Sequence, residues 1–461
     1  MWPRERAQTV LTPRPETDES RVIRSSQGRV TLRRRITHLL LSQRQNLQNL
    51  SVLVIVNFAV DTVGFLTQVK IANTIGKYHF GLIAYGLAIA AYGGVFIRFA
   101  LDRTLVRDLV HHPNRFGELV AASLLLRWML FAAVVAMLLA WKFTAGPVSD
   151  VSWGLLLVIV ANSMMSMDLQ AVYDSWHAMS RHAVYNLIQR CLYFAAIWAI
   201  ITVSPAKLGI LSIGAATLGS VTCYLVLQHT WAIARMTLPA TRRAVFRAAI
   251  RMAKGNLTIW LATLGGLSFG SLNQLVLKHY RGTAELGGYA VAWQMVSLAM
   301  MLLNQVGRIG NPMTARVTRD GIQSKERIWF LAQYTSVMVL TALPVAFAAI
   351  CFPGLILRTL FRPEYASAAN ALRIMGVFML VYSVGIVASQ FVVSTRLEKT
   401  YLASIVVGGV LGVAACALLI PAMGANGAAI ALVVSTSAAV GLCWAAISIK
   451  IRKASDLCVQ Q

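Results

Sequence analysis

The stretch "FRPEYASAANALRIMG" (361–376) lies between two long apolar segments and interrupts them with charged residues. Pro363 breaks the connection between these segments, and the alanines that follow allow close contact between helices. Tyr365 suits a membrane–water interface, and Arg373 can extend its charged end toward water. The stretch is therefore typical of the start of a membrane-spanning helix, with an interfacial anchor in front of it.

The composition of the whole chain predicts a polytopic membrane protein. Of its 461 residues, 57% are hydrophobic and 13% are charged, whereas about 25% are charged in ordinary soluble proteins. The net charge is +25, but the arginines lie mainly at the ends of apolar segments. This distribution follows the positive-inside rule and argues against nucleic-acid binding.

Twelve apolar segments are each near the ~20 residues that a helix needs to cross a bilayer. They lie at 51–72, 78–100, 117–141, 152–178, 183–203, 208–233, 256–278, 286–307, 328–352, 368–393, 401–421 and 424–449. Most Lys and Arg residues fall in the tails and in alternate loops, which predicts that both termini are cytoplasmic. The fold class predicted is an all-α membrane protein of about twelve spans.

The polar segments and the spans together divide the chain. We expect a disordered basic cytoplasmic tail, an amphipathic interfacial helix, two six-helix halves joined by a basic cytoplasmic linker, and a second cytoplasmic tail. The tail is residues 1–28 and the interfacial helix 29–50. The first half is 51–234, the linker 235–255 and the second half 256–450. The final tail is 451–461.

An internal repeat relates the two halves. A shift of 206 residues brings Gly76 onto Gly282 and Gly81 onto Gly287. Because six is an even number of spans, both halves have the same orientation in the membrane. They are then related by an axis along the membrane normal, with a central cavity between them.

Four motifs resemble those of bacterial polysaccharide-export proteins. Besides the opening stretch, they are "HFGLIAYGLAIA" (79–90), "FALDRTLVRDL" (99–109) and "STRLEKT" (394–400). Their order within twelve spans is similar to the oligosaccharide (O-antigen type) flippases of the multidrug/oligosaccharidyl-lipid/polysaccharide exporter superfamily. The basic tail is longer than that pattern requires.

The resemblance implies a flippase that carries undecaprenyl-diphosphate-linked oligosaccharide repeat units across the bacterial inner membrane by alternating access. It implies a MATE-like arrangement, no covalent chemistry and no cofactor or metal, with a proton or Na⁺ gradient as an energy source. Implied partners are the lipid-linked oligosaccharide, membrane lipids, a polysaccharide polymerase and its chain-length machinery.

Ionisable groups inside spans are costly and mark candidate functional sites. In the first half these are Asp61, Arg98, Arg127, Asp168, Asp174 and Arg190. In the second half the polar groups at comparable depth are neutral, namely Asn273, Gln274, Gln294, Asn304, Gln305 and Gln390. The charge is therefore concentrated in the first half.

Guanidinium groups bind phosphate oxygens in a bidentate manner and stay charged. We therefore expect Arg98, Arg127 and Arg190 to contact the substrate diphosphate; the alternative is structural pairing with carboxylates such as Asp168, Asp174 and Asp102. Asp61 is a candidate for coupling to a proton or Na⁺, by analogy with a first-span aspartate in some multidrug members. The alternative for Asp61 is a salt bridge or a hydrogen bond between helices.

Other functions are less consistent with the sequence. A cation-coupled multidrug exporter would select cationic drugs, which embedded arginines disfavour, and lipid II flippases have fourteen spans. A membrane polysaccharide polymerase would need a large outside loop, and no metal-ligand or nucleotide motif is visible. Aromatic residues such as Trp260 and Trp293 are candidates for stacking on sugar rings or, more commonly, are core residues.

Overall fold

The computed structural model describes residues 18–144, 152–176, 178–204, 207–235, 241–266, 270–318, 324–395 and 397–459. Within these ranges the chain is helical apart from short connections, and none of the described residues belongs to a β-strand. The predicted all-α class is confirmed.

The chain forms two compact units, Met1–Ile55 and Val56–Gln461. Helix α1 (Asp18–Arg98) begins in the first unit. Residues 18–28 are therefore helical rather than disordered, while residues 1–17 of the predicted tail lie outside the described residues. Residues 29–50 belong to α1, and the side chains that would make this segment amphipathic lie outside the description, so the interfacial helix stays a prediction.

Helix α1 consists of two helices joined at Gly76. This glycine has φ 80° and ψ 169°, a conformation that essentially only glycine adopts. The apolar part, Phe58–Arg98, is 41 residues long, about twice the length that one span needs. The break at Gly76 thus separates the first two predicted spans.

The described residues in the rest of the first half form six α-helices and two 3₁₀ turns. They are α2 (Leu101–His111), η1 (Pro113–Arg115), α3 (Phe116–Thr144), α4 (Trp153–Met164), η2 (Met165–Met167), α5 (Gln170–Ser175), α6 (Met179–Val203) and α7 (Ile210–Ile233). The fourth predicted span is therefore not one helix but α4 and α5 joined through η2.

The second half contains eight α-helices and one described 3₁₀ turn. They are α8 (Arg242–Gly266), α9 (Ser271–Arg281), α10 (Thr283–Val317), α11 (Ser324–Cys351), α12 (Pro353–Leu360), η5 (Pro363–Ala368), α13 (Ala369–Ser394), α14 (Glu398–Met423) and α15 (Ala425–Val459). The final tail predicted from residue 451 continues α15 as far as Val459.

Ten described helical segments are long and apolar enough to cross a membrane. One of them, Phe58–Arg98, holds two spans. The predicted seventh span is absent from the ten because α8 ends at Gly266 and α9 begins at Ser271. Glycines at 265, 266 and 270 disfavour a continuous helix there. Counting α8 and α9 as one broken span agrees with about twelve spans.

The two halves meet through a symmetric pair of glycines. A Cβ placed on Gly81 would collide with the carbonyl oxygen of Thr283, and one on Gly287 would collide with that of Lys77. Lys77 and Thr283 are related by the same 206-residue shift as the glycines. Gly282 also repeats the conformation of Gly76, with φ 83°. The α1 and α10 backbones therefore cross where only glycine allows the approach.

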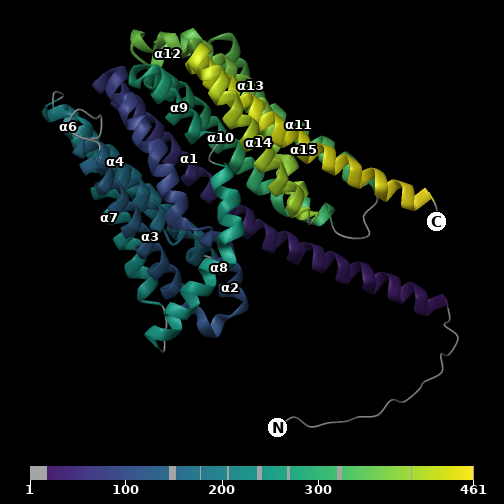
Figure 1. Cartoon of the computed structure of the whole chain (residues 1–461). Helices are drawn as coiled ribbons and strands as arrows, with labels where there is room; N and C mark the ends of the chain where they lie inside the picture. Colours follow the sequence, from purple (N-terminus) through teal and green to yellow (C-terminus); the bar gives the residue numbers. More distant parts are fainter. Residues whose placement is uncertain are drawn as a thin grey trace. The chain divides into compact units, whose positions relative to one another are not determined.

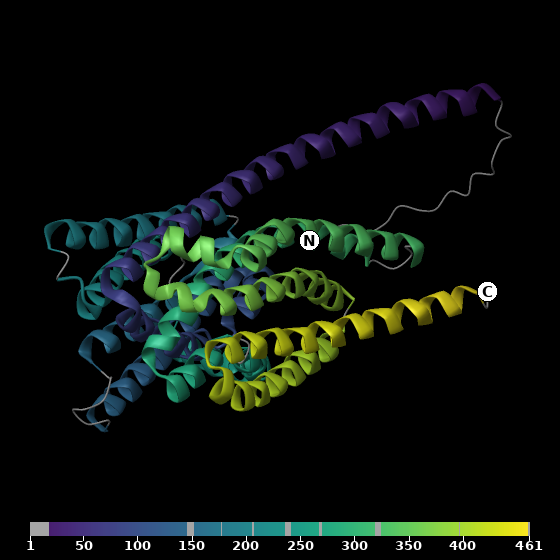
Figure 2. The ribbon, with the colours of Figure 1, turned by 90° about the horizontal axis from the view of Figure 1, so that it is seen from above.

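Within the larger unit the helices form two bundles (Figure 1). In one bundle α7 packs against α4 and α6; in the other α13 and α14 both pack against α15. The view from above shows α14 and α15 side by side (Figure 2). One bundle is built from helices of residues 51–234 and the other from helices of residues 256–459.

The predicted basic linker, 235–255, is helical over most of its described residues. From Arg242 it forms the start of α8, and its apolar residues Val245, Ala248 and Met252 are buried in a core cluster with residues of α2, α3 and α5. The arginines of this segment, such as Arg243, remain exposed. The linker thus attaches the second half to the first.

Candidate functional site

A cavity between the two halves brings together Asp61 and Arg190. Its volume is about 90 Å³, and its walls come from α1, α6 and α10. The lining residues are Val60, Asp61, Gly64, Phe65, Gln68, Arg190, Gln294, Ser297, Leu298 and Met301. On α1 and on α10 they recur at helical spacing, so one face of each helix forms the wall. We call this space the junction cavity.

Arg190 lies against α1 at Gly64, which has no side chain. A Cβ on Gly64 would be 3.8 Å from Nη1 of Arg190, so the glycine leaves room for the guanidinium one turn after Asp61. The Nε of Arg190 is excluded from solvent and has no hydrogen-bond partner. Among the described residues Arg190 forms no ion pair within 4.0 Å, although its charge acts on Asp61. The positive charge of Arg190 is thus available within the cavity.

The junction cavity is small in this conformation. Its 90 Å³ is room for a few water molecules, and less than the ~300–1,000 Å³ of a typical ligand pocket. A diphosphate needs more space than this. The cavity therefore has to widen, and because its walls belong to both halves, moving the halves apart would do so.

Arg127, in contrast, is held in a dry structural contact. Its side chain is 1% exposed and pairs with Asp102 at the start of α2. Its Nη1 donates to the carbonyl oxygens of Ser166, at 3.1 Å, and of Asp168, at 2.6 Å. This geometry corresponds to the structural alternative considered for Arg127, because the guanidinium joins α2, α3 and the η2–α5 connection.

Arg98 lies apart from the junction cavity. It is the last residue of α1 and is exposed. At 1.5 Å per residue, Arg98 is about 33 Å along the helix from Gly76, whereas Asp61 is about 22 Å from it on the other arm. Next to Arg98, Phe99 stacks on Trp260 of α8 with ring centroids 5.0 Å apart. Arg98 is thus farther from Gly76 along α1 than Asp61 is.

The two remaining candidate carboxylates have different surroundings. Asp168 accepts the backbone N–H of Gln170, the first residue of α5, at 3.3 Å. Asp174 is half-buried on α5, and Arg308 of α10, in the other half, acts on it electrostatically. The structure therefore brings Asp61 and Arg190 together in one cavity, and it separately joins Arg127 to the backbone of Asp168.

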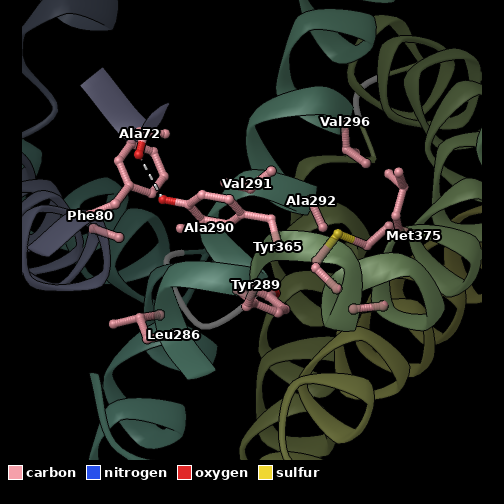
Figure 3. Close-up of a cluster of buried hydrophobic side chains, with 14 of the residues drawn as sticks. Ala72, Phe80, Leu286, Tyr289, Ala290, Val291, Ala292, Val296, Tyr365 and Met375 are labelled. Carbon is pink, nitrogen blue, oxygen red and sulfur yellow. Dashed lines mark hydrogen bonds between the residues drawn. The ribbon is translucent and has the colours of Figure 1, made fainter. Parts of the chain in front are cut away.

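The opening stretch contacts α1 next to the break at Gly76. Tyr365, which we expected at a membrane–water interface, is 0% exposed and donates its hydroxyl to the carbonyl oxygen of Ala72 at 3.0 Å (Figure 3). Asn73 donates to the carbonyl oxygen of Leu360 at 2.7 Å, and Lys77 donates to Ser367 Oγ, also at 2.7 Å. We call these contacts between α1 and the α12–η5 segment the end seal.

Some lining residues were missed by sequence reasoning. Gly64 carries no charge and has no motif, yet its missing side chain makes space for Arg190. Ser297 and Gln68 are polar residues at helical spacing from Gln294 and Asp61, so a search for polar residues on the same helix face would have found them.

Comparisons with known families agree with this architecture. The chain matches the family model of the polysaccharide biosynthesis protein over residues 46–310 and the MatE family model over residues 262–418. The first match covers more than half of the 461 residues. No curated protein sequence matches the chain.

Solved structures share the fold. The inward closed conformation of the lipid II flippase MurJ has a TM-score of 0.70 with 14% identity, over 87% of this chain and 88% of MurJ. An inward-facing multidrug resistance MATE family transporter has a TM-score of 0.59, also with 14% identity, over 88% of this chain and 95% of the transporter. A MOP superfamily transporter from Pyrococcus furiosus has a TM-score of 0.53 at 14% identity, over 87% and 95%.

Proposed function

We propose a cargo for this chain, which belongs to the polysaccharide biosynthesis protein family and is a transporter of the MOP superfamily. That cargo is a lipid-linked oligosaccharide. The substrate would be an undecaprenyl-diphosphate-linked repeat unit for a surface polysaccharide such as an exopolysaccharide, capsule or O-antigen. The chain moves it across the bacterial inner membrane without forming or breaking covalent bonds.

The observation that carries this proposal is the unpaired guanidinium of Arg190 in the junction cavity. A diphosphate that leaves water loses strong hydration, which a transporter must replace. Arginine replaces it with charge-assisted hydrogen bonds that stay in place at any physiological pH. Arg190 is the diphosphate contact, and Arg98, exposed near the opposite end from Gly76, is an entry contact. We give Arg127 a structural role instead, because its Nη1 and Nη2 atoms are occupied by Ser166, Asp168 and Asp102.

Asp61 provides the coupling. When a diphosphate binds Arg190, negative charge arrives beside the Asp61 carboxylate. Two anions in one cavity repel each other, and this repulsion favours release of the diphosphate on the outside. A proton or Na⁺ then binds Asp61 from the outside and is released to the cytoplasm when the empty transporter returns, so inward cation movement drives the cycle. Substrate movement and cation movement are then linked through a single residue pair.

Alternating access follows from the end seal. With both termini cytoplasmic, Gly76 and the α12–η5 segment face the outside, and the end seal closes the outer end. The diphosphate enters from the cytoplasmic side, where such units are made, while the lipid tail stays in the bilayer. Breaking the end seal and separating the halves then exposes the junction cavity to the outside.

A cation-coupled multidrug exporter is the second candidate, because the MatE model matches residues 262–418. An organic cation in the junction cavity would meet Arg190 and be repelled, so this function predicts drug export that improves when Arg190 is neutralised. Deletion with unchanged sensitivity to cationic drugs removes this candidate.

Substrate accumulation tests the proposal directly. A strain that lacks the chain should accumulate undecaprenyl-linked repeat units in the cytoplasmic leaflet, and a plasmid copy should clear them. Enzymatic labelling of the glycan in inside-out and right-side-out vesicles reports the leaflet. Repeat units that instead accumulate outside, unpolymerised, would assign the defect to a polymerase and overturn the proposal.

A further inference from the structure

A second, larger cavity lies within the second half. Its volume is about 570 Å³, within the ~300–1,000 Å³ typical of ligand sites. Helices α9, α10, α13, α14 and α15 contribute to its walls, together with the end of α8. Neither the diphosphate contact nor the coupling residue is part of this cavity. We call it the second-half cavity.

The lining of the second-half cavity is polar but uncharged. None of the described residues that line it is Asp, Glu, Lys or Arg. Its polar groups are amides and hydroxyls, including Gln274, Asn304, Ser271 and Thr436. The cavity therefore offers hydrogen bonds without the charge that an ion, a phosphate or a cationic drug would need.

Two of these amides have hydrogen-bonding capacity to spare. Gln274 makes no hydrogen bond to any described residue. Asn304 accepts the hydroxyl of Tyr382 at 3.0 Å through Oδ1, which leaves its NH₂ group free to donate. A third amide, Gln390, is anchored instead, since it donates to the carbonyl oxygen of Gly307 at 3.0 Å. Gln274 and Asn304 are thus the groups that a ligand would satisfy.

Aromatic rings form a continuous part of the wall. The centroid of Trp293 is 6.2 Å from that of Phe378, which in turn is 5.6 Å from that of Tyr382. The indole of Trp293 lies 3.5 Å from where a Cβ on Gly270 would be, so a larger residue would press on it. A row of flat apolar faces beside amides and hydroxyls matches a molecule with C–H faces and a rim of hydroxyl groups.

One helix lies between the two cavities. On α10, Trp293, Met300 and Asn304 face the second-half cavity. The adjacent face of the same helix, including Gln294 and Met301, lines the junction cavity. A substrate that places its diphosphate against Arg190 therefore has its next chemical group close to the uncharged cavity.

We propose that the second-half cavity binds uncharged sugar residues of the substrate glycan. Gln274 and Asn304 hydrogen-bond to sugar hydroxyl or acetamido groups, and Trp293 packs against a ring face. The identity of the glycan rests on the proposed function, but the binding chemistry follows from the cavity itself. The substrate is then recognised twice, by charge in the first half and by neutral contacts in the second.

The test compares two probes on the purified full-length chain. One probe is undecaprenyl diphosphate, and the other is the same lipid carrying a neutral tetrasaccharide of glucose and galactose. The variants are Asn304→Leu and Trp293→Ala. The matched control is Asn162→Leu on α4, because the Asn162 amide donates only to its own helix, at Val158 O.

The expected result is selective. Each cavity variant binds the glycosylated probe about tenfold more weakly while keeping wild-type affinity for the bare lipid, which also shows that it is folded. The control changes neither affinity. Equal losses for both probes would show a site for the lipid chain, and unchanged binding of the glycosylated probe would show no site; each result overturns this inference alone. A wild-type chain that binds neither probe overturns the proposed function as well.

Discussion

Arg127 and Arg190 show how one residue type serves two purposes in the same half. Arg127 donates to two carbonyl oxygens and pairs with Asp102. Arg190 is half-buried and lines the junction cavity beside Asp61, with no ion pair within 4.0 Å to any described residue. Its position in a cavity favours substrate binding, whereas the contacts of Arg127 favour a structural role.

Replacing Arg127 should damage the fold rather than the transport step. In Arg127→Leu the carboxylate of Asp102 and two carbonyl oxygens lose their donor, and a buried acceptor left without a donor costs about 1–3 kcal/mol. We expect a lower unfolding temperature in detergent and less protein in the membrane. Arg243→Leu, an exposed change on α8, is the control. Normal stability of Arg127→Leu would return Arg127 to the list of substrate contacts.

Replacing Asp61 should uncouple transport. Asp61→Asn keeps the shape of the side chain and removes its charge, so the junction cavity no longer exchanges a cation when the diphosphate binds. We expect wild-type protein levels, slow export, and a rate that no longer responds to an imposed proton or Na⁺ gradient. Normal surface polysaccharide in this variant would remove Asp61 from the mechanism.

At the residue scale the sequence indicated which groups are unusual but not how each is used. The depth of Asp61 and Arg190 within apolar segments was sufficient to select them. The partners of Arg127 include the backbone carbonyls of Ser166 and Asp168, and any residue offers a carbonyl. Such pairing depends on tertiary position, so it could not be predicted from the pattern of side chains.

At the scale of helices, the crossing of α1 and α10 depends on Gly81 and Gly287. Gly81→Leu should place side-chain atoms against the backbone of Thr283 and force the two helices apart. We expect loss of folded protein in the membrane. Gly219→Leu on α7 is the matched control, because a Cβ there meets nothing within 4 Å. Equal protein levels for the two variants would contradict the close crossing.

The repeat paired the glycines of this crossing but did not predict that the helices cross there, and the helix breaks were not predicted either. Gly76 and Gly282 were paired by the 206-residue shift and share a left-handed φ. The interruption between α8 and α9 was not predicted, because the hydropathy of the segment stays high across its glycines. The 3₁₀ turn η2 lies in "MSMD" (165–168), which contains neither glycine nor proline. Packing against Arg127, rather than local sequence, explains that break.

At the scale of the whole transporter, the end seal sets the balance between conformations. Tyr365→Phe leaves the buried carbonyl of Ala72 without its donor, at a cost of about 1–3 kcal/mol to the sealed state. That cost corresponds to a shift of roughly 5- to 150-fold toward the outward-open state. We expect faster labelling of a cysteine at position 68 by an impermeant maleimide added outside.

Tyr173→Phe is the control for this shift. Tyr173 is also buried and also donates to a backbone carbonyl, that of Gln228, but within the first half. It should leave labelling at position 68 unchanged. If both variants label alike, or if labelling from the outside falls in Tyr365→Phe, the end seal does not control outward opening.

The central claim is that a cationic cavity carries the diphosphate of a glycolipid. Its most direct test measures flipping by the purified chain in proteoliposomes. The substrate is an undecaprenyl-diphosphate oligosaccharide with a fluorescent glycan, and an impermeant quencher reports the leaflet. The wild-type chain should move it, and Arg190→Gln should be slower by roughly ten- to a hundredfold, the loss of ~1.5–3 kcal/mol for hydrogen bonds to a charged group. Flipping by Arg190→Gln at the wild-type rate would contradict the account.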